Sequence, residues 1–581
     1  MTHRPENLLT VWSDVLMRAL SDAGVREVVA SPGSRSTPFL LAAHREPRLR
    51  VRMVIDERAA AFFALGLARA GGPPPLLLCT SGTAPAHYYP AVIEASEASV
   101  PLLVLSADRP KDLVLARAPQ STDQTRLYGV HARAFVDLGE PSPAATSLAL
   151  LQEAAVDAVA RALGPEPGPV HLNAPARKPL EPTEAATDEG RALFARAGAL
   201  TPRPPAPVRT LDPDAASLAA VRRALEESER PALVAGPRAI ELASADVALR
   251  LAREGSLALM AETASQLRLG DRDGVLVADG FEHWIERGEL TPDLVIEIGG
   301  VPTSSAYARW LDRAGPRRRF VLGGARHRDP SGRAEAVLLG PEARMLESLI
   351  ATTPRAAWRK VIDAHERAAW HAVDVAMAEA PFGEAHASRV ALEALDDVAA
   401  DGATLAIGNS NPIRSLDRYT RGATLRNGRR VGVLSQRGVN GIDGWIAGCA
   451  GAAAQTRTPL LALIGDVTFS HDLGALALAR QATSPLVYLV LDNRGGRIFE
   501  ELPIASTLDE DDFRLFSTPP TVDLAAAAAA FGVRYARASE PVALRAALDE
   551  ALRTPRASVV VAEVPEHGAR DLLRAVKARL A

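Results

Sequence analysis

Short hydrophobic runs alternate along this chain with longer amphipathic stretches that are rich in alanine. Between the first few runs, the apolar residues of 57–70 and 84–98 recur at helical spacing. Each run in the first third of the chain ends in polar or turn-forming residues, and these runs lie at 26–31, 76–81, 102–107 and 169–175. Short strands separated by helices are typical of parallel sheets with helices on both faces.

The same alternation continues through two further regions. A proline-rich passage, 201–217, precedes the second region and cannot continue a helix, and a charged amphipathic stretch, 359–380, precedes the third. The second region has hydrophobic runs at 231–236, 257–262, 293–300 and 319–324. The third has runs at 404–410, 430–435, 460–464, 486–491 and 558–565. We therefore predict an α/β protein with three doubly wound parallel-sheet domains, at 1–182, 211–355 and 356–581, and a linker at 183–210.

Composition narrows the class of protein. The chain has 581 residues, too many for one core, and its 47% hydrophobic and 23% charged residues are typical of soluble globular proteins. Its net charge of −4, with both signs interspersed, argues against a nucleic-acid-binding surface. We find no signal-peptide pattern and no apolar run of the ~18 residues that span a bilayer, which predicts a cytoplasmic protein without membrane segments. Cys79 and Cys449 lie among small or apolar residues, so we expect buried thiols in a reducing compartment.

Two neighbouring strands of the third region end in oxygen-bearing side chains. Asp466 follows the run 460–464, and Asn493 follows the run 486–491 with two glycines shortly after it. Parallel strands present their carboxyl ends at one edge of a sheet, where ligands bind. Carboxylate, amide and backbone carbonyl oxygens suit Mg²⁺, and glycines allow the backbone to approach a ligand closely. The pattern favours a cradle for a metal and a diphosphate, although the same residues are also ordinary turn formers.

Gly465-Asp466 followed 27 positions later by Asn493 resembles the thiamine-diphosphate (ThDP) motif of a large enzyme superfamily. In that motif the aspartate, the asparagine and a following backbone carbonyl hold a divalent metal on the cofactor diphosphate. This chain departs from the motif in having Val467 where a third glycine is usual. The resemblance implies three domains of the ThDP-enzyme type, with the pyrimidine-binding domain first and the diphosphate-binding domain last. It implies a Mg²⁺ or Mn²⁺ ion at Asp466, Asn493 and Gly495, and further cofactor contacts from Gly465, Thr468 and Gly496.

The superfamily also needs a glutamate that hydrogen-bonds the aminopyrimidine ring of ThDP. The candidate is Glu57, at the head of a predicted helix, although the pair Asp56-Glu57 is also what helix capping and the helix dipole favour. By this resemblance Glu57 is catalytic and Asp56 is only a helix-start acid. The resemblance further places apolar side chains against the cofactor, although core packing is their usual role: Ile442, Ile498 and Phe499.

Polar loops after several strands offer groups that bind anions. An arginine alone is more often a surface charge or part of a structural ion pair, but several converging on one site would bind a substrate with several carboxylates. The candidates of the first region are Ser34, Arg35, Arg109 and Gln120. Those of the third region are Ser410, Arg414 and Arg437.

Eight motifs together resemble the family of 2-succinyl-5-enolpyruvyl-6-hydroxy-3-cyclohexene-1-carboxylate (SEPHCHC) synthases of menaquinone biosynthesis. The likeness covers essentially the full chain, is strongest across 31–129 and 404–503, and rests on PGSRSTP, TSGTA, YPAVIEA, ADRP, GPVHLN, GNSNPIR, RGVNGIDG and NRGGRIF. It implies decarboxylation of 2-oxoglutarate and 1,4-addition of the succinyl carbanion to isochorismate. By resemblance, isochorismate would face Ser34, Arg35, Arg109 and Gln120. The succinyl carboxylate would be held by Ser410, Arg414 and Arg437, with Leu502 also at the substrate.

One departure concerns the acceptor. The family pattern has a lysine in the central domain where this chain has Ser305 and Ala306, so Arg309, Arg326 or Arg328 would have to substitute. This departure leaves open a second hypothesis, another ThDP-dependent 2-oxoacid decarboxylase or carboligase with a different acceptor. A non-catalytic ThDP-binding relative is a third hypothesis, and the presence of the glutamate and the metal pair argues against it. Because the superfamily assembles its site across a subunit interface, we also expect a homodimer or a dimer of dimers.

Overall fold

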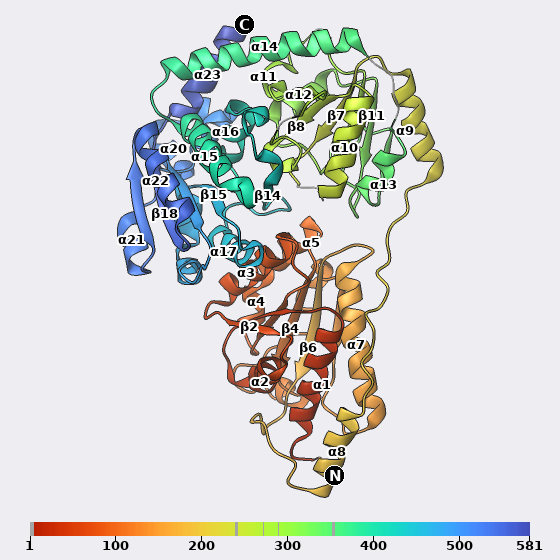
Figure 1. The fold of residues 1–581 in the computed structure, drawn as a ribbon. Helices are drawn as coiled ribbons and strands as arrows, with labels where there is room; N and C mark the ends of the chain where they lie inside the picture. The colour runs from red at the N-terminus through yellow and green to blue at the C-terminus, as the bar shows by residue number, and fades with distance from the viewer. Residues whose placement is uncertain (1–4, 239–241, 271, 289, 351–354) are drawn as a thin grey trace. The chain divides into compact units, whose positions relative to one another are not determined.

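The computed structural model describes residues 5–238, 242–270, 272–288, 290–350 and 355–581. Among these residues it contains three six-stranded sheets in which all paired strands are parallel (Figure 1). Helices lie on both faces of each sheet, so the predicted α/β class with three doubly wound sheets is confirmed. No helix in the described part of the chain is both long and apolar enough to cross a lipid bilayer.

Contacts divide the chain into two compact units. The first unit comprises Met1–Thr210 together with Gly438–Gln455, and the second comprises Leu211–Arg437 together with Thr456–Ala581. The first unit thus contains one sheet, and the second contains the other two. Residues 438–455 were expected within the third domain, but they make their contacts with the first.

The first sheet has the strand order β2-β1-β3-β4-β6-β5. Its strands are β1 (Glu27–Ala30), β2 (Arg50–Met53), β3 (Leu76–Cys79), β4 (Leu102–Asp108), β5 (Ala134–Asp137) and β6 (Pro169–Pro175). The helices of this unit are α1 (Leu8–Asp22), α2 (Thr37–Arg45), α3 (Glu57–Arg69), α4 (Ala84–His87), α5 (Tyr89–Ala98), α6 (Lys111–Leu115), α7 (Ala145–Leu163), α8 (Asp188–Gly198) and α17 (Trp445–Thr456).

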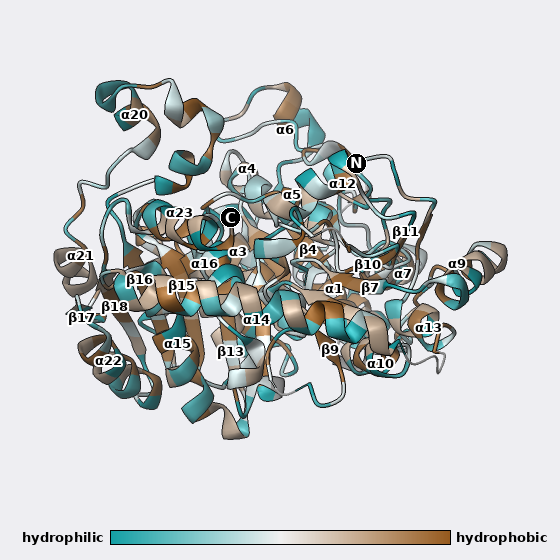
Figure 2. Ribbon diagram, turned by 90° about the horizontal axis from the view of Figure 1, so that it is seen from above, coloured by the Kyte–Doolittle hydropathy of each residue, from teal (hydrophilic) through white to brown (hydrophobic). Residues whose placement is uncertain are grey.

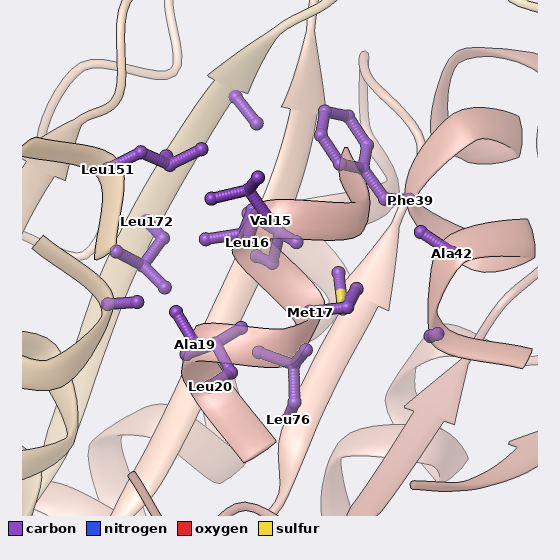
Figure 3. Close-up of a cluster of buried hydrophobic side chains, with 14 of the residues drawn as sticks. Val15, Leu16, Met17, Ala19, Leu20, Phe39, Ala42, Leu76, Leu151 and Leu172 are labelled. Carbon is purple, nitrogen blue, oxygen red and sulfur yellow. The ribbon is translucent and has the colours of Figure 1, made fainter. Parts of the chain in front are cut away.

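One face of the first sheet is covered by α1, α2 and α7. Figure 3 shows Leu16 and Leu20 of α1 beside Leu76 of β3 and Leu172 of β6, all fully buried. Alternate strand residues point to opposite faces of a sheet, and the other face is in contact with α3 and α5. Because both faces are covered, the central strands are continuous hydrophobic runs, which is why they were recognisable in the sequence.

The central sheet has the order β12-β11-β10-β7-β8-β9. Its strands are β7 (Pro231–Ala235), β8 (Ala258–Ala261), β9 (Leu276–Val277), β10 (Leu294–Ile298), β11 (Arg318–Leu322) and β12 (Ala336–Leu338). One face packs against α9 (Ala215–Glu227), α10 (Leu242–Glu254) and α13 (Glu342–Glu347). The other face packs against α11 (Phe281–Trp284) and α12 (Ser305–Arg313).

The third sheet has the order β14-β13-β15-β16-β18-β17. Its strands are β13 (Ala403–Ile407), β14 (Val431–Ser435), β15 (Leu460–Gly465), β16 (Leu486–Asp492), β17 (Arg534–Ala538) and β18 (Ala557–Glu563). One face packs against α15 (Glu384–Val398), α16 (Asn411–Tyr419) and α22 (Pro541–Arg553). The remaining helices after β15 are α18 (Asp466–His471), α19 (Leu476–Ala479), α20 (Glu510–Ser517), α21 (Leu524–Ala530) and α23 (Gly568–Leu580).

The long helix α14 (Ala356–Glu379) joins the two sheets of the second unit. Its first half buries Trp358 and Ile362 in the core of the central sheet, and its second half packs against α23. Figure 2 shows hydrophobic and hydrophilic colours alternating along this helix, as expected of an amphipathic helix with one exposed side.

The sequence analysis missed four of the strands at the edges of the sheets. The strands β5, β9, β12 and β17 lie at sheet edges or are very short, and exposed edge strands lack the continuous hydrophobic runs of buried ones. The stretch 84–98 was expected as one helix and instead divides at Tyr88 into α4 and α5. Helix α8 lies inside the segment expected as a linker, because Leu193 and Ala197 pack into the core of the first sheet.

Candidate active site

The two metal-loop candidates are brought together at the carboxyl edge of the third sheet. Strands β15 and β16 are neighbours, with Gly465 paired to Leu491. Asp466 begins α18, and its Oδ2 accepts a hydrogen bond of 2.8 Å from the backbone N–H of Gly495, two residues beyond Asn493. The carboxylate after one strand therefore contacts the glycine loop after the next.

This loop requires glycine at position 495. Gly495 has a φ of +122°, and a Cβ atom there would lie 2.2 Å from the carbonyl oxygen of Ser517. The next amide, of Gly496, donates a hydrogen bond of 2.6 Å to that same oxygen. A side chain at 495 would therefore push apart the turn that faces Asp466.

The oxygens at this edge fit a divalent cation. Asp466 and Asn493 are both buried, and the Asn493 Oδ1 has no hydrogen-bond partner in the structure. Burial raises the pKa of Asp466 to about 7, although the backbone N–H groups of Val467 and Gly495, which donate to the carboxylate, act in the opposite direction. Among the described residues, no group of three or more His, Cys, Asp or Glu side chains could hold a metal. One carboxylate, one amide and one carbonyl suit an ion that takes its remaining ligands from phosphate and water.

The residues predicted to bind the succinyl carboxylate of the donor substrate lie on neighbouring loops of the same sheet. Ser410 precedes α16 with φ 70° and ψ −133°, a conformation that costs a non-glycine residue on the order of 1–3 kcal/mol. Arg414, one turn into α16, donates a hydrogen bond of 2.9 Å to the Ser410 carbonyl. Burial, together with the guanidinium groups of Arg418 and Arg437, lowers the pKa of Arg414. An anionic ligand would relieve this repulsion.

Arg414 lines a cavity of about 450 Å³ that also contains Glu384, Asn411, Arg418 and Glu501. Arg418 was not among the predicted site residues; it is buried and pairs with Glu282 at 3.2 Å and with Glu501 at 2.9 Å. It thereby ties α16 to α11 of the central sheet and to the segment after the metal loop. Spacing from Arg414 along one helix face was the only signal for it in the sequence.

The remaining candidates of the third region surround the metal loop. Gly465 precedes α18 and Thr468 is buried within it. Ile498 and Phe499 are half-buried in a 3₁₀ turn, Arg497–Glu501, directly after the glycines, and Leu502 follows with 46% of its surface exposed. Arg437 donates a hydrogen bond of 3.2 Å to Asn409, whereas its Nε is buried without a partner. Ile442 is half-buried in the segment that belongs to the first unit.

In the first unit, Glu57 is the first residue of α3 and is half-buried. Its neighbour Asp56 is the helix cap, as predicted, because its carboxylate accepts hydrogen bonds from the backbone N–H groups of Arg58 and Ala59. The Glu57 side chain has no such role in the helix. Two apolar residues just before it, Met53 and Ile55, are 47% and 87% exposed.

The two arginines of the first unit that were predicted to face the acceptor substrate, Arg35 and Arg109, lie close enough to affect each other. Arg35 is buried, donates to the Ala176 carbonyl at 2.6 Å, and has its pKa lowered by burial and then by Arg109. Arg109 donates to the Ser81 hydroxyl and to the carbonyl of Gln120. Gln120, with φ 57°, is exposed, and so is Ser34. Ser81 was not among the predicted site residues, although the TSGT motif that contains it was noted.

Glu94, which is fully buried, was also not among the predicted site residues. Its carboxylate pairs with Arg69 and accepts hydrogen bonds from the backbone N–H groups of Gly438, Val439 and Asn440, at 3.0, 2.6 and 2.9 Å. A hydrophobic helix context hid this acid, since only the three-dimensional structure reveals its partners. Glu94 thus anchors the loop that leads to Ile442.

The three arginines considered as replacements for the missing lysine all interact with other residues. Ser305 begins α12, and Ala306 is buried. Arg309, one turn further on, makes a bidentate ion pair with Glu286, in which its Nε and Nη2 each donate a hydrogen bond of 2.8 Å. Arg326 and Arg328, the other two cations considered, also interact with neighbouring residues.

Comparisons with known proteins identify the relatives of this chain. Residues 11–127 match the model of the thiamine pyrophosphate enzyme N-terminal TPP binding domain, and residues 425–562 match that of the C-terminal TPP binding domain. A SEPHCHC synthase from Sorangium cellulosum is 38% identical over 97% of this chain and 94% of its own length. Others from Myxococcus xanthus and Geobacillus kaustophilus are 38% and 37% identical, over 94% and 91% of this chain and 93% and 90% of their own.

The chain belongs to the SEPHCHC synthase family. This confirms the resemblance drawn from its motifs. Two solved structures share the fold of this family member: a putative thiamin diphosphate-dependent enzyme from Mycobacterium smegmatis, at 20% identity and a TM-score of 0.67, and the benzoylformate decarboxylase from Polynucleobacter necessarius, at 15% and 0.69. The matches cover 95% and 96% of this chain and 99% of the two solved chains, so the likeness in fold extends over nearly the whole chain.

Proposed function

We propose that this chain is a ThDP-dependent transferase that decarboxylates 2-oxoglutarate and adds the succinyl unit to isochorismate, giving SEPHCHC and CO₂ in menaquinone biosynthesis. The observation that carries the proposal is the similarity to SEPHCHC synthases over nearly the whole chain. The neighbouring arginines on the first sheet and on the third sheet support it, because both substrates are carboxylates. We place the activity in the cytoplasm, where buried thiols such as Cys79 and Cys449 stay reduced.

The third-sheet loops would hold the cofactor through a divalent metal. Asp466, the Asn493 amide oxygen and the carbonyl of Gly495 would bind Mg²⁺ or Mn²⁺, with Ile498 and Phe499 as an apolar wall. The bound ThDP supplies a nucleophilic carbon and an electron sink for the decarboxylation. The residues of this chain bind the cofactor, orient it and exclude water.

The donor and acceptor carboxylates would be bound by different sheets. Arg414, Arg437 and Ser410 would bind the succinyl carboxylate of 2-oxoglutarate through charge-assisted hydrogen bonds. Arg35, Arg109, Gln120 and Ser34 would bind isochorismate. The Ser81 hydroxyl and the Gln120 carbonyl hold the Arg109 side chain, so the acceptor cations are oriented in advance of binding.

Glu57 would be the catalytic acid–base. Its carboxyl group would hold a proton at the ring nitrogen of the cofactor aminopyrimidine. Because Asp56 already caps α3, the Glu57 side chain is available for this task.

The reaction itself is the direct test. Purified protein with ThDP and Mg²⁺ should consume isochorismate only when 2-oxoglutarate is present, with SEPHCHC identified by mass spectrometry and one CO₂ released per isochorismate. Release of CO₂ without loss of isochorismate would refute the proposed acceptor.

We further propose a homodimer in which Glu57 of one subunit serves the metal loop of its partner. The exposed Met53 and Ile55 beside Glu57 support this, since apolar surface of this kind favours association. The inactive variants Glu57→Gln and Asp466→Ala, mixed and allowed to exchange subunits, should recover about a quarter of wild-type activity, because each mixed dimer then has one intact site. Sites built within single subunits would give no recovery.

A further inference from the structure

A buried carboxylate lies behind two of the candidate site loops. Glu384 is the first residue of α15 and is 3% exposed. Its Oε1 accepts hydrogen bonds from the side-chain amide of Asn493, at 2.7 Å, and from that of Asn411, at 3.1 Å. No sequence motif pointed to this residue, which lies 109 positions before Asn493.

An asparagine amide has two ends of nearly the same shape, but only its oxygen can bind a metal ion. A carboxylate only accepts hydrogen bonds, so Asn493 must turn its Nδ2 towards Glu384 and its Oδ1 away from it. That Oδ1 is buried and has no hydrogen-bond partner. Leaving such an atom unsatisfied costs about 1–3 kcal/mol unless a ligand contacts it.

We infer that Glu384 is a positioning residue for the metal: it holds the Asn493 amide in the one orientation that leaves the oxygen available to a divalent cation. The inference rests on the proposed function, since it presupposes a metal at Asp466, Asn493 and Gly495. The same Oε1 also holds Asn411 at the start of α16, the helix that carries Arg414. One carboxylate therefore fixes both the metal loop and the donor-side helix.

The decisive measurement is Mn²⁺ affinity in the presence of ThDP, followed by the loss of the free Mn²⁺ signal in electron paramagnetic resonance. Glu384→Ala removes the acceptor and should weaken binding about 10- to 100-fold. Glu384→Gln keeps an oxygen for both amides and should recover affinity to within about threefold of wild type. Wild-type affinity in Glu384→Ala would overturn the inference. A Glu384→Gln variant as weak as Glu384→Ala would also overturn it, because charge rather than the acceptor would then matter.

A double-mutant cycle tests the orientation itself and still decides if Glu384→Ala fails to fold. Asn493→Asp places a second carboxylate against Glu384, where the amide donor now lies 2.7 Å away. Adding Glu384→Gln supplies a donor to the new carboxylate, so the double variant should bind Mn²⁺ more tightly than Asn493→Asp alone. Absence of this recovery would contradict the proposed role.

Controls separate this inference from the proposed function. Glu379→Gln is the matched variant, since Glu379 lines the same cavity but pairs with Arg579 at the surface, and it should leave Mn²⁺ affinity unchanged. Melting temperatures without metal should be similar for Glu384→Gln and wild type. A wild-type protein that binds no Mn²⁺ with ThDP would refute the metal site itself, whereas normal wild-type binding with no effect of Glu384→Ala would refute only the role of Glu384.

Discussion

The first and third sheets have the same strand order, and the central sheet does not. Counted from the first strand of each sheet, both outer sheets have the order 2-1-3-4-6-5, whereas the central sheet has the order 6-5-4-1-2-3. Every site residue predicted from the motifs, apart from the central-domain alternatives, comes from the regions of the first and third sheets. In open parallel sheets, ligands bind beyond the carboxyl ends of strands, so equal strand order gives the two sheets equivalent loops.

Equivalent loops carry different chemistry. After the third strand, the first sheet has Ser81 and the third sheet has Asp466; after the fourth strand, they have Arg109 and Asn493. The first sheet thus presents a hydroxyl and a cation where the third presents a carboxylate and an amide. After the second strand the signs are reversed, with Glu57 in the first sheet and Arg437 in the third. The fold supplies the positions, and the side chains alone assign the function.

The largest expected effect comes from changing Glu57, the acid proposed to act on the cofactor. Glu57→Gln should lower kcat about 10³-fold, because an amide cannot hold and return the proton at the cofactor ring. Binding of ThDP with Mg²⁺, measured by calorimetry, should stay within about threefold of wild type, since the metal ligands lie on the other sheet. Unchanged turnover would remove Glu57 from the mechanism.

Glu94 gives the next largest effect, on stability. Glu94→Ala leaves Arg69 and three backbone N–H groups without their buried partner, which should destabilise the first unit by about 3 kcal/mol in thermal unfolding. Glu153→Gln, in a surface ion pair with Arg203, is the matched control and should cost under about 1 kcal/mol.

The Glu94 carboxyl also gives a pH signature, measured with a second variant, Glu94→Gln. Burial raises the pKa of Glu94, but Arg69 and the backbone N–H groups outweigh it and hold the pKa below its ordinary value of 4.5. A carboxyl group with a depressed folded-state pKa stabilises the fold above the unfolded-state pKa and loses this effect as pH falls through the folded-state value. The stability gap between wild type and Glu94→Gln should therefore be full at pH 7 and shrink below about pH 4.5. A gap that widens on acidification would contradict this role.

Glu94 and Asp466 show why the sequence revealed some site residues and hid others. The strands, helices and loop residues such as Asp466 follow from local patterns, because a buried parallel strand is a hydrophobic run and its end is polar. Glu94 accepts a hydrogen bond from Val439, 345 positions later, and Glu384 accepts one from Asn493, 109 positions later. No local sequence pattern reveals pairs so far apart. Helix α8 was missed for a related reason: its two buried hydrophobic side chains, Leu193 and Ala197, are too few to give a clear hydrophobic period.

The arginines of the two sheets should separate the substrates. Arg414→Ala should raise the KM for 2-oxoglutarate about 10- to 100-fold with little change for isochorismate, and Arg109→Ala should do the reverse, since a charge-assisted hydrogen bond is worth about 1.5–3 kcal/mol. Steady-state kinetics with each substrate varied in turn measures both values. Arg161→Ala, on the surface of α7, is the control. If either variant raised both KM values equally, the assignment of one substrate to each sheet would be wrong.

The smallest effect contrasts two adjacent acids. Asp56→Ala removes the cap of α3, which should cost about 1 kcal/mol of stability, seen as a lower melting temperature. Asp56→Asn keeps a capping oxygen and should restore most of it. Turnover should fall less than about threefold in both, because the cap holds backbone N–H groups whereas the Glu57 carboxyl does not. If Asp56→Ala instead lost as much turnover as Glu57→Gln without losing stability, the two acids would share the chemistry. The assignment of Asp56 as a helix cap alone would then be wrong.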